Sequence, residues 1–285
     1  MATRTPAFTP VTMSASLFMR AAFVFVAAAG VSLFVLSEQT SDFFAWTIKP
    51  SITAAFLGGG YLAVATALGL GLRESDWASV RVGIWVVATG LVSILIATLL
   101  HLDKFHLHSP LWTARVWAWS WLFLYVSLLP GLLPGLLAAV WTQWRQPAAT
   151  PVAGAALPAG LRISQWLLGG VMAAIGATLF LTPANAEQLW PWSLTPLTAR
   201  MVGSFYLAIG VSLCAAAREN EYARIRVANF AYLVFAVLQF VTALRYPVVD
   251  WGTRPGLLLA AVLLALFAIG SIGIRGGLKP RDIGK

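Results

Sequence analysis

The sequence predicts an all-α polytopic membrane protein, with eight transmembrane helices arranged as two parallel four-helix repeats. Three observations lead to this class: the composition, the length of the apolar runs and an internal similarity. Of 285 residues, 59% are hydrophobic and only 10% are charged, and the mean hydropathy is +0.81. A soluble domain carries about 25% charged residues, so water is not the solvent for most of this surface.

The net charge of +9 comes from 19 Lys and Arg residues that lie between the apolar runs. They form no continuous basic stripe, so we expect them to face anionic lipid and not nucleic acid. The single cysteine, Cys214, excludes a disulfide scaffold. The lipid bilayer is therefore the first predicted partner, and an unknown protein partner or a small solute is the second.

Eight apolar runs are long enough to span a membrane. A bilayer core about 30 Å thick needs roughly 20 apolar residues in a helix, and the runs that meet this are 16–36, 52–72, 82–101, 116–141, 164–182, 199–217, 227–245 and 256–274. With eight spans, 13 of the 19 basic residues fall on the side that holds both termini. The positive-inside rule therefore predicts that both termini are cytoplasmic and that the protein lies in the cytoplasmic (cell) membrane.

The chain is similar to itself. Residues 53–82 match residues 198–227 at 12 of 30 positions with a constant offset of 145, and upstream an offset of 146 pairs Trp46 with Trp192. Each copy holds four spans, an even number, so the two copies are predicted to be parallel. The expected domains are a first repeat at 1–141, a cytoplasmic linker rich in Ala, Pro and Gly at 142–163, and a second repeat at 164–285.

A pseudo-two-fold axis makes the boundary between the repeats a natural place for a cavity. Four polar side chains within the spans are candidates to line it: Tyr61, Tyr206, Asn229 and Gln239. The alternative is that duplication fused an ancestral homodimer and left a packed interface. Span 116–141 also contains two Pro-Gly pairs that we expect to kink or break it, and a broken helix can line a pathway.

The loops after the second and sixth spans repeat an Arg-Glu-x-acid-aromatic-Ala pattern. The charged residues of the two copies are Arg73, Glu74, Asp76, Arg81, Arg218, Glu219, Glu221 and Arg226. They could form a symmetric cytoplasmic gate of ion pairs. We favour the simpler interpretation that the acids cap the following helices and the arginines anchor the loops on the inner side.

All three histidines lie in one segment at the outer end of the third span. Together with a carboxylate they could bind zinc or another divalent metal, through His101, Asp103, His106 and His108. The spacing matches no metal signature, and Lys104 within the segment disfavours a cation. We therefore favour a polar turn at the membrane edge and predict no cofactor.

Other motifs are absent from the sequence. No Asp, Glu or Lys lies in the middle of a span, which argues against an ion-coupled pump. There is no Walker loop, nucleophile elbow or His-Glu-x-x-His motif, and no catalytic residue stands out. The first hypothesis is a facilitative permease or channel for a small, weakly polar solute. The second is a non-transporting accessory or assembly protein that binds lipid or a partner subunit, and the third is a membrane enzyme that uses the His101–His108 segment.

About two thirds of the chain resembles bacterial multi-pass membrane proteins of the kind common in actinobacteria. The residues that carry the resemblance are Trp190 to Arg200 (WPWSLTPLTAR), Arg73 to Arg81 and His101 to Phe105. No activity is attached to that group. The resemblance therefore implies an integral membrane protein and transfers no site residue.

Overall fold

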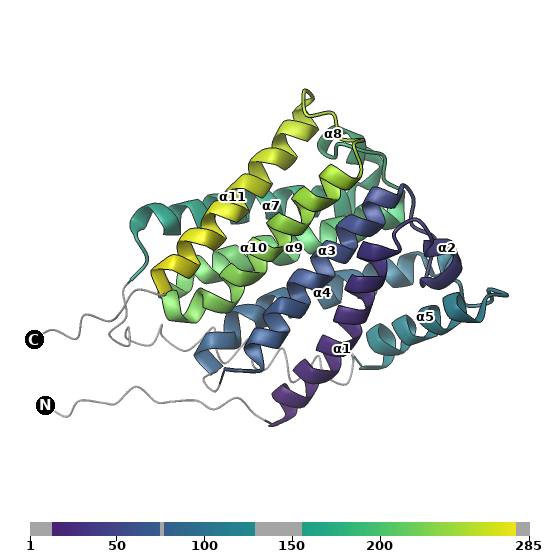
Figure 1. Ribbon diagram of the computed structural model, residues 1–285, viewed down its shortest axis with the longest axis horizontal. Coiled ribbons are helices and arrows are strands. Elements are labelled where there is room, and N and C mark those ends of the chain that lie inside the picture. The colour runs from purple at the N-terminus through teal and green to yellow at the C-terminus, as the bar shows by residue number, and fades with distance from the viewer. Residues whose placement is uncertain (1–12, 75–76, 129–155, 278–285) are drawn as a thin grey trace, which may run out of the picture.

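The computed structural model describes residues 13–74, 77–128 and 156–277, and every regular element in these ranges is a helix (Figure 1). The long helices are α1 (Met13–Val35), α3 (Ser51–Gly71), α4 (Trp77–Leu100), α7 (Ala159–Leu181), α9 (Pro196–Glu219), α10 (Tyr222–Arg245) and α11 (Arg254–Gly277). The shorter elements are α2 (Thr40–Phe43), η1 (Leu102–Lys104), α5 (Trp112–Leu122), the π-helix η2 (Phe123–Leu128), η3 (Pro183–Asn185) and α8 (Ala186–Leu189). The predicted all-α class is confirmed.

Six of these helices are long and apolar enough to cross a membrane: α3, α4, α7, α9, α10 and α11. The protein is therefore a multi-pass membrane protein. The apolar part of α1 is the shorter stretch Met19–Val35. The predicted fourth span begins as α5 and η2, and its remainder, with both Pro-Gly pairs, lies outside the described residues.

The two central helices are α3 and α9, and 72% of the apolar 18-residue stretch of each is buried inside the protein. We call α1 to η2 the first half of the protein and α7 to α11 the second half. Helix α3 packs against α1 of its own half and α10 of the other, while α9 packs against α7 of its own half and α4 of the other (Figure 1). The halves therefore interlock through α3–α10 and α4–α9.

Glycines allow the close approach of α1 to α3 and of α7 to α9. A Cβ on Gly58 of α3 would overlap the backbone of Phe34 in α1, and a Cβ on Gly203 of α9 would lie 2.7 Å from the carbonyl oxygen of Gly176 in α7. In lipid there is no hydrophobic drive between helices, so close backbone contact through small residues supplies the association. Both crossings therefore depend on glycine at the contact point.

The ends of the long helices carry local signals. Pro196 opens α9, where a missing N–H costs nothing, and the Thr195 hydroxyl accepts a bond from the Thr198 N–H at 3.2 Å. Asn220 ends α9 with a φ of 52°, a left-handed conformation that asparagine tolerates better than most residues. Helix α7 begins at Ala159, so the last residues of the linker predicted at 142–163 are helical.

Candidate functional site

Helix α10 carries a row of polar side chains on its buried face. Asn229, Tyr232, Gln239 and Thr242 are between 0% and 3% exposed, and their spacings of three, seven and three residues place them on one side of the helix. This side faces α3, α9 and α11, which pack around α10. We call these four residues the polar face of α10.

Gln239 joins the polar face to the first half of the protein. Its Nε2 donates to the backbone carbonyl of Phe56 in α3 at 3.0 Å. Gly59 makes room for the carboxamide, since a Cβ there would lie 2.8 Å from that nitrogen. The Oε1 of Gln239 is buried and accepts no hydrogen bond. The carboxamide nitrogen therefore has a hydrogen-bond partner and the carboxamide oxygen has none.

Tyr232 and Asn229 contact other helices of the second half, whereas the Thr242 hydroxyl donates to the Leu238 carbonyl of α10 itself. The hydroxyls of Tyr232 and Ser212 in α9 share a hydrogen bond of 2.5 Å. The side chain of Asn229 lies against Gly273 in α11, and neither Nδ2 nor Oδ1 has a hydrogen-bond partner. An unpaired amide in an apolar medium costs about 1–3 kcal/mol by mutational measures, so the polar face destabilises the bundle that contains it.

Charged residues meet at the end of the bundle where α9 ends and α10 begins. Arg81 of α4 pairs with Glu219 of α9, and Arg226 of α10 pairs with Glu74 in the loop after α3. Each pair therefore joins the two halves. The side chains of the first pair are 12% and 13% exposed, whereas Arg226 in the second is 50% exposed. We call this the ion-pair end.

Arg224 extends the network at the ion-pair end, and sequence reasoning missed it. Its guanidinium lies 2.6 Å from Glu221 and 3.4 Å from Glu219, and it is 6% exposed. At an offset of 145 its counterpart is Ser79, so the repeat pattern gave no reason to select it. The difference between Arg224 and Ser79 at corresponding positions is the feature of the sequence that could have identified this residue.

The remaining charges predicted for this cluster are not in these pairs. Arg73 and Arg218 are exposed, and Asp76 lies outside the described residues. Glu221 does not cap α10 as predicted, because it precedes that helix without a side-chain capping bond. Its carboxylate faces Arg224 instead.

At the opposite end, α10 is fixed to the end of α1. Arg245 donates to the backbone carbonyls of Phe34 at 2.6 Å and Val35 at 3.2 Å, two of the last carbonyls of α1 that have no partner within the helix. The neighbouring Tyr246 hydroxyl bonds to the Ser37 hydroxyl at 2.6 Å. Both ends of the polar face therefore meet polar groups.

Indole rings line the same end, which we call the tryptophan end, and one of them ties the halves together. Trp192 donates from Nε1 to the Thr53 hydroxyl of α3 at 2.9 Å, and both groups are buried. The rings of Trp190 and Trp192 lie 5.0 Å apart. The Nε1 of Trp46 is buried without a partner. All three indole rings are therefore buried within the protein.

His101 and His106 of the 101–108 segment have separate partners. His106 donates from Nδ1 to the Phe44 carbonyl at 2.9 Å, which leaves Nε2 to accept from the Thr47 hydroxyl at 3.1 Å in the neutral ring. His108 is exposed. The Lys104 ammonium lies 2.8 Å from the Asp103 carboxylate, and this hydrogen bond holds the pKa of Asp103 below its ordinary value.

His101 contacts α9 instead of the other histidines. Its Nε2 lies 2.7 Å from the Arg200 guanidinium, and since arginine only donates, Nε2 accepts. Burial, and then the charge of Arg200, lower the pKa of His101. In residues 13–74, 77–128 and 156–277, no three His, Cys, Asp or Glu side chains gather closely enough to hold a metal ion.

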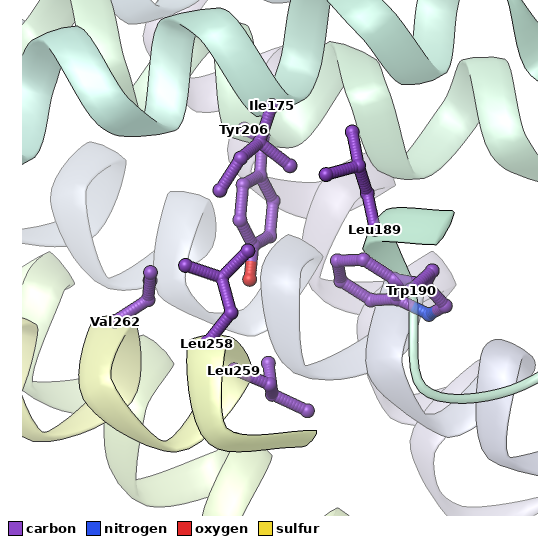
Figure 2. Close-up of a pocket in the computed structure, with 7 residues that line it drawn as sticks. All are labelled: Ile175, Leu189, Trp190, Tyr206, Leu258, Leu259 and Val262. Carbon is purple, nitrogen blue, oxygen red and sulfur yellow. The ribbon is translucent and has the colours of Figure 1, made fainter. Parts of the chain in front are cut away.

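The four residues predicted to line a cavity between the halves are all buried. Tyr61 packs against Phe205 at 5.0 Å between ring centroids, which closes the boundary at that depth. Only Tyr206 of the four lines the small hollow in Figure 2, whose other walls include Trp190 and Leu258. That hollow has no room for a water molecule and lies within the second half.

Comparison of the chain with protein-family models, with curated proteins and with solved structures finds no match.

Proposed function

We propose that the chain crosses the cytoplasmic membrane eight times as two parallel four-helix repeats with cytoplasmic termini. The similarity at an offset of 145 supports this proposal, and so do corresponding contacts. Gly58 and Gly203 are counterparts, and each meets the preceding long helix of its own half. Arg81 and Arg226 are also counterparts, and each pairs with a glutamate of the other half. The excess of basic residues on one side supports the orientation.

Within this architecture we propose a facilitative permease or channel for a small, uncharged, weakly polar solute. The observation that carries the proposal is the polar face of α10, which places two carboxamides and two hydroxyls in the interior of the bundle along one side of one helix. In hydrocarbon, polar groups without partners are costly, and those that persist there commonly mark solute pathways. The face contains no Asp, Glu, Lys or Arg, which favours an uncharged solute.

The experiment is solute flux in proteoliposomes. The purified protein is reconstituted, and the uptake of glycerol and urea is followed by stopped-flow light scattering. We expect uptake several-fold faster than in vesicles carrying an unrelated membrane protein at the same protein-to-lipid ratio. Uptake no faster than in those control vesicles, from protein that is folded and inserted, would contradict the proposal.

A second function has one observation in its favour. Helix α5 and the first residue of η2 present Trp112, Trp119 and Phe123 on one face, and these side chains are 69%, 54% and 65% exposed. A partner subunit could cover such a face, which would make the protein a non-transporting accessory or assembly factor. A partner that co-purifies in fixed stoichiometry, together with flux at the control level, would favour this function over transport.

A further inference from the structure

We propose that the solute path runs along the polar face of α10 alone, and that it takes uncharged solutes carrying both a hydrogen-bond donor and an acceptor. This inference rests on the proposed function and names its route and substrate class. It differs from the cavity expected on the boundary axis, because the polar face belongs to one half.

The first step is that the fold does not need these polar groups. At an offset of 145 the counterparts in α4 of Asn229, Tyr232, Gln239 and Thr242 are Ile84, Val87, Ile94 and Ala97. Helix α4 packs on α9 as α10 packs on α3. Ile94 is 5% exposed and Ala97 is fully buried. Apolar residues therefore suffice at these two corresponding positions, although α4 carries the buried hydroxyls of Ser93 and Thr98 elsewhere. Packing alone does not require Gln239 and Thr242 to be polar.

The second step is the chemistry that the face offers. Asn229 presents an unpaired donor and an unpaired acceptor, and Gln239 presents an unpaired acceptor about ten residues further along the helix, or about 15 Å. Between them lies the hydroxyl pair of Tyr232 and Ser212, in which either oxygen can donate. A solute with both donors and acceptors, such as a small amide or polyol, can form hydrogen bonds with Asn229, the hydroxyl pair and Gln239 one after another.

The third step is the charge at the two ends of the face. At the ion-pair end, Arg224 is next to two carboxylates, Glu219 and Glu221, and Arg81 offsets the second negative charge. At the other end Arg245 is engaged with the carbonyls of α1. The charges at the ion-pair end compensate one another, whereas the Arg245 guanidinium donates to neutral carbonyls and keeps its positive charge. The face between the two ends holds no charged side chain, and moving an ion into a low-dielectric interior is far more costly than moving an amide. The path therefore selects neutral solutes.

The test measures urea and glycerol flux in proteoliposomes for three variants. Gln239→Met and Asn229→Leu remove polar groups from the face with little change in shape. Gln165→Met is the matched control, since Gln165 of α7 is also fully buried with both polar side-chain atoms unpaired but lies outside the face. The loss of one hydrogen bond to the passing solute should slow flux about tenfold. Circular dichroism and size-exclusion profiles confirm that each variant is folded.

We expect flux to fall in Gln239→Met and in Asn229→Leu and to remain at the wild-type rate in Gln165→Met. Gln239→Met and Asn229→Leu both change the polar face of α10. If one of them does not fold, the flux of the other still tests the path. Wild-type flux in all three, or an equal fall in all three, would overturn the path along α10 while leaving the permease function intact. Absence of flux in the unmodified protein would overturn the function and the path together.

Discussion

Helices α4 and α10 occupy corresponding places in the two halves, and their buried faces differ. Both begin at the ion-pair end and both pack against the central helix of the other half. The buried face of α4 carries Ile94 and Ala97 where α10 carries Gln239 and Thr242. The position therefore tolerates apolar residues, and the polar residues of α10 are a local departure. Substitutions in and around the two helices can test this difference between their buried faces.

The largest effect is expected at the ion pairs that begin α4 and α10. Glu219→Gln leaves the buried guanidinium groups of Arg81 and Arg224 with less compensation, and breaking a buried pair costs about 3–5 kcal/mol. Glu74→Gln breaks the corresponding pair with the half-exposed Arg226 and should cost no more than about 1 kcal/mol. Thermal unfolding in detergent measures both. Equal losses would show that the two ion pairs are equivalent.

Polarity can be moved from α10 to α4. Ile94→Gln places a carboxamide in a buried apolar position and should destabilise the protein by about 3 kcal/mol. The reverse change, Gln239→Met, loses one bond to Phe56 but also removes an unpaired oxygen, so the unfolding midpoint should stay nearly constant. If both variants lost the same stability, the polar face would be a packing requirement.

Helix α10 is packed closely against a glycine of α11, whereas α4 carries a glycine that no neighbour approaches. A Cβ on Gly270 of α11 would lie 2.8 Å from the Asn229 carbonyl oxygen and 2.9 Å from the Leu233 nitrogen, whereas a Cβ on Gly83 of α4 would meet nothing within 4 Å. Gly270→Ala should therefore cost about 2 kcal/mol through overpacking. Gly83→Ala should stabilise α4 by about 0.5–1 kcal/mol through helix propensity. Melting curves of the two alanine variants give the comparison.

The smallest effect is expected where α4 ends, at His101. The pKa of His101 is lowered in the folded protein, so as pH falls below about 6.5 the unfolded chain takes up a proton before the folded one does. The unfolding midpoint should decrease over that range. His101→Gln keeps an acceptor for Arg200 but does not titrate, so its decrease should be smaller. His108→Gln, at an exposed position, serves as the control and should follow the wild type.

Much of the fold could be predicted because the length of an apolar run predicts the length of the helix that spans the membrane. The run at 52–72 became α3 at Ser51–Gly71, and the run at 256–274 became α11 at Arg254–Gly277. The short helices α2 and α8 were not predicted, because no apolar period marks four-residue turns. The end of α5 at Leu122, where the π-helix begins, was also missed, since a π-helix has no composition of its own.

The candidate site was predicted in part. The repeated loops selected Arg81, Glu219, Arg226 and Glu74, but which arginine pairs with which glutamate depends on how the halves interlock. The sequence of each span does not show how the halves interlock. The pairing of each arginine with a glutamate of the other half could therefore not be predicted. Asn229 and Gln239 were selected as polar residues within spans, and the structure places them on one face of one helix. Their unpaired atoms emerge only from the packing around them.

The central claim is that solute and water reach the buried face of α10 but not that of α4. The most direct measurement compares Gln239→Cys with its counterpart Ile94→Cys, both in a Cys214→Ala background, for reaction with a small water-soluble methanethiosulfonate. We predict that the thiol at position 239 reacts, that added urea slows the reaction, and that the thiol at position 94 does not react. Equal reactivity at the two positions, or none at either, would contradict the account.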